Sequence, residues 1–110
     1  MDEIYKLVMY RMVTGKEPYL LWLEGLRDEK TKGILRRRLG RMVLGSLGSV
    51  RGVGGGVFEL KIDFGPGYRI YFSFLSKETV VILMGGSKGS QAQDILTAQF
   101  YKEDYLRRLS

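Results

Sequence analysis

The chain has 110 residues and a formal net charge of +6, and it contains neither histidine nor cysteine. It therefore lacks the side chains of an ordinary zinc site, a disulfide framework or a thiol nucleophile. It also lacks the imidazole base of Ser–His–Asp hydrolases and of histidine-dependent nucleases. Any catalysis must use Lys, Arg, Tyr, Ser, Asp or Glu.

The length indicates a single domain over residues 1–110. A hydrophobic content of 45% and a charged content of 27% are typical of a soluble globular protein. No apolar run approaches the ~20 residues of a membrane span, and the acidic start at Asp2 and Glu3 is unlike that of a signal peptide. We therefore expect a cytoplasmic protein with no membrane association.

The first part of the chain predicts a strand and then two helices. Residues 4–10 are rich in β-branched, aromatic and apolar side chains, which indicates a short, largely buried strand. Pro18 suits the first position of a helix, and Asp28 suits the N-cap of the next one. Apolar residues recur on one face of each helix: Tyr19, Trp22, Leu23 and Leu26 in the first, and Leu35, Leu39, Met42 and Val43 in the second.

Positive charge is concentrated in residues 28–56, which hold seven basic and two acidic side chains. Such a segment attracts polyanions, although a solvated helix face and an acidic partner protein are alternative interpretations. The end of this segment, residues 45–56, contains six glycines. It predicts a long, mobile loop with a functional role rather than a simple linker.

The second part of the chain predicts three antiparallel strands and a helix. Residues 57–64 alternate, so Phe58, Leu60, Ile62 and Phe64 should face the core, and Glu59, Lys61 and Asp63 should face solvent. Residues 65–67 form a turn, and residues 68–74 form the return strand of a hairpin. Residues 79–84 predict a central strand covered on both faces, residues 85–90 a turn, and residues 91–109 a helix. The order is β-α-α-β-β-β-α, an α+β fold with a mainly antiparallel sheet, an N-terminal helical hairpin and a C-terminal helix.

Three short patterns do not complete a known site. Residues 85–89 match G-x-S-x-G, but the chain has no histidine to activate the serine. The same segment lacks the G-K-[ST] ending of a phosphate loop. Glu59 and Asp63 lie four residues apart, but two acids beside a basic face are better interpreted as surface charges than as a metal site.

One cluster of basic residues is a better candidate for a functional site. Lys61 and Arg69 lie on the two strands of the predicted hairpin, and Tyr71 shares a face with Arg69. If the register brings these faces together, Arg51 and Lys88 could surround the patch. Clustered Arg and Lys bind phosphates, and a neighbouring aromatic ring can stack on an unpaired base. RNA also supplies its own nucleophile, the 2′-OH, so cations that neutralise the phosphate suit its cleavage.

At these residues the sequence resembles a known family. Residues 56–72, which read GVFELKIDFGPGYRIYF, are similar to the signature of RelE/ParE-superfamily toxins, and most similar to their HigB-like "addiction module killer protein" branch. The similarity continues through residues 83–88 (LMGGSK) and 91–95, and it includes Trp22-Leu23 and Arg38-Leu39 in the helical hairpin. It thus covers nearly the whole chain in the order of the family.

The resemblance implies the toxin of a type II toxin–antitoxin pair, with a RelE-like fold. It implies cleavage of mRNA on the ribosome without a metal or other cofactor, and a partner antitoxin, usually a helix-turn-helix protein through which DNA would be contacted only indirectly. By position in the motifs, the resemblance assigns catalysis to Lys61, Arg69 and Lys88 and a basic position of the site to Arg51. Tyr71 is our own candidate for stacking or proton transfer, and Gln91 for contact with the RNA substrate. From its charge alone, we expect the second helix to bind the ribosome or an acidic antitoxin through Lys32, Arg36, Arg37 and Arg41.

Two other functions stay open at this point. A ParE-like protein of the same superfamily would inhibit DNA gyrase by binding, with no chemistry of its own. An inactive relative would keep only RNA or protein binding. The same fold serves all three functions, so the fold alone does not choose among them.

Overall fold

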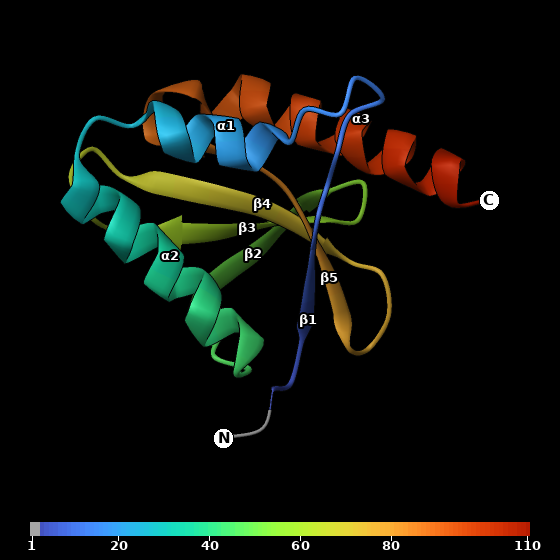
Figure 1. Ribbon diagram of the computed structural model, residues 1–110, viewed down its shortest axis with the longest axis horizontal. Helices are drawn as coiled ribbons and strands as arrows, with labels where there is room; N and C mark the ends of the chain where they lie inside the picture. The colour runs from blue at the N-terminus through green and yellow to red at the C-terminus, as the bar shows by residue number, and fades with distance from the viewer. Residues whose placement is uncertain (1–2) are drawn as a thin grey trace.

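The computed structural model describes residues 3–110, and it is built from five strands and three helices (Figure 1). In chain order the elements are β1 (Lys6–Met9), α1 (Pro18–Gly25), α2 (Glu29–Val43), β2 (Ser49–Gly54), β3 (Val57–Ile62), β4 (Tyr68–Phe74), β5 (Thr79–Ser87), a short 3-10 turn (Lys88–Ser90) and α3 (Gln91–Leu109). The predicted α+β class is confirmed. Within residues 3–110, no helix combines the length and the apolar character needed to cross a bilayer.

The strands form one sheet in the order β1-β5-β4-β3-β2. The β2–β3, β3–β4 and β4–β5 pairs are antiparallel, whereas β1 lies parallel to β5. The predicted mainly antiparallel sheet is therefore confirmed. The strand expected over residues 4–10 is shorter than predicted, because β1 lies at the edge of the sheet and its first residue, Lys6, is exposed.

The predicted loop over residues 45–56 is wrong in its main part, because β2 occupies residues 49–54 and pairs with β3. The glycines serve the turn between these strands. Gly54, Gly55 and Gly56 all have positive φ angles, of 97°, 64° and 74°, which other residues adopt only with strain. The glycine content of residues 45–56 suggested a loop because this one segment contains both a short edge strand and the tight turn that follows it.

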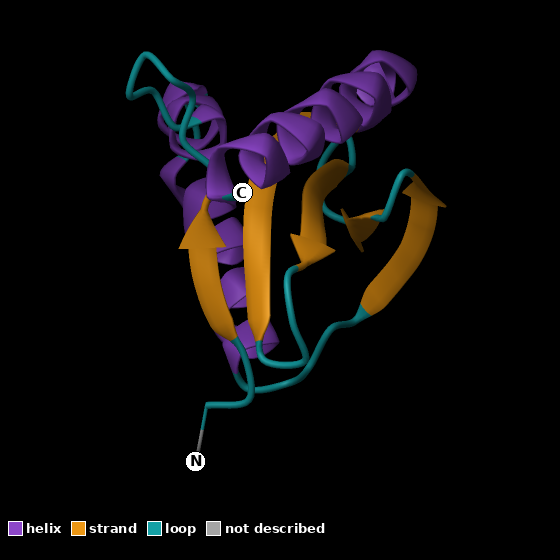
Figure 2. Cartoon of the chain, turned by 90° about the vertical axis from the view of Figure 1, so that its right-hand side faces the viewer, coloured by secondary structure: helices purple, strands orange, loops and turns teal. Residues whose placement is uncertain are grey.

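Each face of the sheet has its own layer of helix (Figure 2). One face packs against α1 and α2, in a core that includes Leu35, Ile70 and Ile82. The opposite face packs against α3, in a smaller core that includes Leu83 and Ala98. Consecutive residues of β5 contribute to opposite cores, so the predicted central strand, covered on both faces, is confirmed.

The helices begin where the sequence predicted. Pro18 opens α1, and the Asp28 carboxylate accepts a hydrogen bond from the Lys30 backbone N–H at 3.1 Å, as an N-cap does. The Thr31 hydroxyl also donates a hydrogen bond to Asp28, at 2.7 Å, and this bond is the main reason that the pKa of the carboxyl is lowered. The α3 helix spans residues 91–109, as expected.

The turn predicted over residues 85–90 starts later than expected, because β5 continues to Ser87. A Cβ atom on Gly85 would overlap with the Trp22 ring, and one on Gly86 would overlap with the Asp94 carboxylate. These glycines are therefore places where a side chain from another element approaches the strand backbone, rather than positions in a turn.

Candidate functional site

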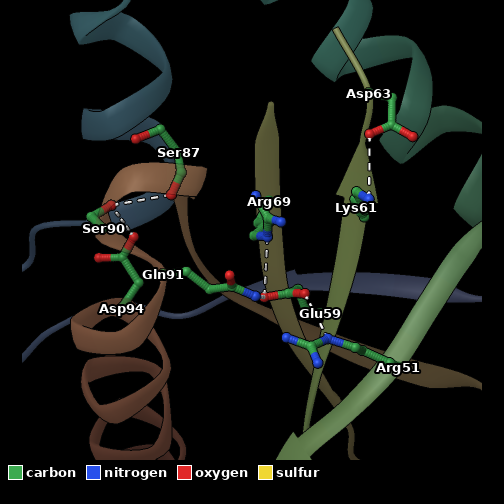
Figure 3. A network of polar contacts seen from close by, with 9 residues as sticks. All are labelled: Arg51, Glu59, Lys61, Asp63, Arg69, Ser87, Ser90, Gln91 and Asp94. Atoms are coloured by element: carbon green, nitrogen blue, oxygen red, sulfur yellow. Dashed lines mark hydrogen bonds and ion pairs between the residues drawn. The ribbon is translucent and has the colours of Figure 1, made fainter. Parts of the chain in front are cut away.

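The site is centred on a pair of cations that face each other across two strands. In the antiparallel register of β3 and β4, Lys61 lies directly opposite Arg69. Both side chains point to the face of the sheet that α3 covers, because their neighbours Leu60 and Ile70 point into the core beneath α1 and α2. The cation patch expected on the hairpin is thus formed by direct cross-strand neighbours, as Figure 3 shows.

Two adjoining pockets meet at this pair. The first, of about 410 Å³, lies over the turn between β3 and β4 and is lined by Lys88 and Asp63 as well as by Lys61 and Arg69. The second, of about 390 Å³, adds Ser49, Val50, Arg51, Glu59 and Gln91 to the same two cations. Lys61 and Arg69 therefore form the boundary between two open pockets with an excess of basic groups.

Glu59 lies at the floor of the second pocket, which corrects the expectation that it faces solvent. Its side chain is only 2% exposed. It accepts hydrogen bonds from Arg51 Nε at 3.0 Å and from Gln91 Nε2 at 2.8 Å, and Arg69 Nε lies 3.4 Å from its second oxygen. Alternation along β3 gave the correct face of the sheet, but that face is enclosed by the start of α3 and by β2.

The ionised form of Glu59 is favoured by these partners. Burial alone would raise the pKa of this carboxyl, but the hydrogen bonds from Arg51 and Gln91 and the charges of Arg51 and Arg69 outweigh burial and lower the pKa. The carboxylate is therefore charged at neutral pH, and it offsets part of the positive charge of the site.

Arg69 is a buried cation with unused donors. Its side chain is 7% exposed, and within residues 3–110 neither Nε nor Nη1 has a hydrogen-bond partner, although Nε is ion-paired with Glu59. A buried donor without an acceptor is costly, so this guanidinium favours an anion that enters the pockets it lines.

Tyr71 does not play the stacking role that the sequence suggested. It lies opposite Glu59 on β4, and its ring is fully buried in the core beneath α3, so no ring face is open to a base. Its hydroxyl has no hydrogen-bond partner among the described residues. Burial raises the pKa of this phenol, and the negative charges of Glu59 and Asp94 raise it further, so it stays protonated at neutral pH and is a poor base.

The other predicted residues divide into two groups. Lys88, in the turn that precedes α3, and Arg51, on β2, line the pockets, as does Gln91 at the first position of α3. The remaining predicted contacts lie on α2, which packs on the opposite face of the sheet, and none of them lines either pocket: Lys32, Arg36, Arg37 and Arg41. Among these four, Lys32 is paired with Glu29 at 3.4 Å.

Two acidic residues of the site were missed as partners of the cations. Besides Glu59, Asp63 lines the first pocket and lies 3.6 Å from Lys61 Nζ. Counting outward from the 65–67 turn places Glu59 opposite Tyr71 and beside the Lys61–Arg69 pair, so the hairpin register was the signal that could have found it. Within residues 3–110, no three acidic side chains come close enough together to hold a metal ion.

Comparison with known proteins identifies one relative and no described family. No family model matches the chain. An uncharacterized protein of Haemophilus influenzae is 35% identical to it over 83 residues, which covers 76% of this chain and 84% of that protein. The similarity extends over most of both chains, so it is not confined to an isolated motif.

Proposed function

This chain belongs to the same family as the Haemophilus influenzae protein, and we propose that it is the toxin of a type II toxin–antitoxin pair. It would act as an endoribonuclease that cleaves mRNA on the ribosome without a metal, and so inhibit translation and growth. The proposal includes a RelE-like version of the α+β fold described above. It rests on the resemblance of residues 56–72, 83–88 and 91–95 to these toxins, together with the geometry of the cations.

One observation carries the proposal: the cross-strand pair of Lys61 and Arg69 lines two adjoining pockets at once. A phosphodiester that binds at this boundary would meet both cations, and the nucleotides on its two sides would have a pocket each. Lys88 in the first pocket and Arg51 in the second extend the positive surface along the same path. This arrangement suits an extended, single-stranded polyanion better than a compact one.

The chemistry follows from what these groups can do. The 2′ oxygen of the RNA attacks the adjacent phosphorus and gives up its proton to solvent water. The bond from phosphorus to the 5′ oxygen breaks, and a 2′,3′-cyclic phosphate and a 5′-hydroxyl result. Arg69 and Lys88 would neutralise the charge that develops on the phosphate oxygens. We assign protonation of the departing 5′ oxygen to the Lys61 ammonium, because its side chain is 47% exposed and carries mobile donors.

The basic residues outside the pockets suit a second task. Arg36, Arg37 and Arg41 are exposed on α2, on the other side of the sheet. We propose that this helix binds ribosomal RNA or an acidic surface of the antitoxin, which would be a helix-turn-helix protein in the cytoplasm. These charges would speed association without taking part in the reaction.

Expression of the chain without its antitoxin tests the proposal. We expect growth arrest and cuts within the codons of translated mRNA, mapped by sequencing the 5′-hydroxyl ends. Arg69→Ala and Lys88→Ala should relieve both effects, whereas Lys77→Ala, which removes an exposed cation from the β4–β5 turn, should relieve neither.

Other results would contradict the proposal in different ways. Intact mRNA with arrested DNA replication would point to inhibition of gyrase instead. Absence of toxicity, with the protein shown to be folded and present, would argue against both kinds of toxin. Because Arg69 is buried, circular dichroism of the purified Arg69→Ala protein is needed, and Lys88→Ala supplies the exposed counterpart.

A further inference from the structure

We infer that Glu59 is a positioning residue that orients two guanidinium groups, those of Arg51 and Arg69, so that their outer N–H groups face the pockets. The carboxylate lies between the two arginines at the floor of the second pocket (Figure 3). For the kinetic part of its test, this inference rests on the proposed function. Its structural part does not.

The contacts of Glu59 involve the inner edge of each guanidinium. One carboxylate oxygen accepts the Arg51 Nε–H at 3.0 Å, and the other lies 3.4 Å from Arg69 Nε. Among residues 3–110, neither arginine is paired with a second carboxylate. The Nη groups of Arg51, which can bind a phosphate with two parallel hydrogen bonds, are therefore left for a ligand. Arg69 Nη1 is buried and has no hydrogen-bond partner among these residues, so this guanidinium also lacks an acceptor.

Glu59 is itself held in place from a distant part of the chain. The Gln91 side chain donates to its second oxygen at 2.8 Å, across 32 residues of sequence, from the first position of α3. With 2% exposure, the carboxylate has little freedom to turn away from the arginines. The orientation of both guanidinium groups therefore depends on where α3 lies on the sheet.

The two arginines depend on this carboxylate to different degrees. Arg69 is enclosed, at 7% exposure, whereas the Arg51 side chain is 63% exposed on an edge strand. A buried cation that loses its counter-ion must move toward water, and an exposed one only loses a preferred orientation. Loss of the carboxylate should therefore displace Arg69 more than Arg51.

A positioning role has a kinetic signature that a binding role lacks. Glu59→Gln removes a negative charge from a phosphate-binding site, so RNA should bind at least as well as before. The arginines would no longer be oriented, and small displacements of positioning groups are costly to the chemical step. For cleavage on purified ribosomes, we expect kcat to fall about 10- to 100-fold while KM stays the same or decreases.

The structural part is tested by NMR on the 15N-labelled full chain. The Nε–Hε signals of Arg51 and Arg69 are assigned by their loss in Arg51→Lys and Arg69→Lys. In Glu59→Gln both signals should shift toward those of exposed arginines, with the larger shift for Arg69. Glu103→Gln, the same change at an exposed glutamate on α3, should leave both signals in place.

A second variant keeps the test decisive if Glu59→Gln does not fold. Gln91→Ala removes only the amide that holds the carboxylate, and it should shift the same two signals in the same direction by a smaller amount. Unchanged arginine signals in Gln91→Ala and in a folded Glu59→Gln protein would overturn the inference, as would a raised KM with an unchanged kcat. A chain that cleaves no RNA but shows the NMR shifts would instead contradict the proposed function alone.

Discussion

The two faces of the sheet are built on different principles. The face beneath α1 and α2 is covered by a continuous apolar core, with Leu35, Ile70 and Ile82 fully buried. The face beneath α3 is apolar only in part and continues into buried polar groups, among them Glu59 and Arg69. Among residues 3–110, four buried side-chain nitrogen or oxygen atoms have no hydrogen-bond partner, and three of them, two on Arg69 and one on Tyr71, also lie on the α3 face.

Because of this difference, the face beneath α1 and α2 is suited to stabilising the fold, and the face beneath α3 is suited to recognising a ligand. Apolar burial on the first face stabilises the fold without directional requirements. On the second face, buried polar groups are stabilised only by partners in the correct positions, and some of those positions are left for a ligand. The sheet therefore holds a mainly apolar core on one side and, on the other, polar groups that a substrate would complete under the proposed function.

The largest expected effect comes from breaking either core at β5. The side chains of Ile82 and Leu83 point to opposite faces from adjacent positions, and both are fully buried. The variants Ile82→Ala and Leu83→Ala therefore each create a cavity in one core. Each should lower the free energy of unfolding by about 2–5 kcal/mol, measured by urea denaturation. The arginine Nε–Hε signals should stay in place in Ile82→Ala and shift in Leu83→Ala, where the support of α3 is weakened.

An intermediate effect is expected at the two glycines of β5. In Gly85→Ala the new methyl group meets the Trp22 ring, which is fixed between elements, so we expect a loss of about 1–3 kcal/mol of stability. In Gly86→Ala it meets the end of the Asp94 side chain, which can turn aside, so the loss should be smaller. Equal losses of stability in thermal melts of the two variants would contradict this difference between the fixed Trp22 ring on one face and the adjustable Asp94 side chain on the other.

The acid sensitivity of the fold should depend on the polar face. The pKa of Glu59 is lower in the folded chain than its ordinary value of about 4.3, so its ionised form stabilises the fold above that value. This contribution is lost as the pH falls through the lowered pKa. The stability difference between the unaltered chain and Glu59→Gln should therefore be largest near neutral pH and shrink in acid, as measured by urea denaturation at several pH values.

The smallest expected effect is that of Tyr71→Phe. The hydroxyl it removes is buried and has no partner among the described residues, so we expect its loss to raise stability by no more than about 1 kcal/mol. RNA cleavage should be retained, because the ring offers no open face to a base. A large loss of cleavage without loss of stability would show that the phenol takes part in the reaction after all.

The sequence predicted the elements that depend on local periodicity. The apolar spacing of α1 and α2 and the alternation of β3 were sufficient, because local patterns determine these elements. The sequence placed Lys61 and Arg69 on the two strands of a hairpin but left their pairing conditional on the register, which the structure supplies. The strand β2 was missed because its glycines are typical of loops.

The part of the site that could not be predicted depends on distant segments. Alternation showed which face Glu59 points to, but its burial depends on Gln91 and on Arg51, which reach it from other elements. The burial of Tyr71 likewise depends on the packing of α3 against β4 and β5. A strand pattern specifies the side on which a residue lies, and tertiary packing decides whether that side meets water.

The edge position of β2 gives the two arginines of the site unequal local stability. β2 is hydrogen-bonded to one neighbour only, across a register shift between Gly52 and Gly54, whereas β4 is bonded on both sides. Backbone amides of β2 should therefore exchange with deuterium through local opening, long before those of β4 are released by global unfolding. We therefore expect Arg51 to lie on a strand that opens locally, and Arg69 to lie on one that stays paired until the whole chain unfolds.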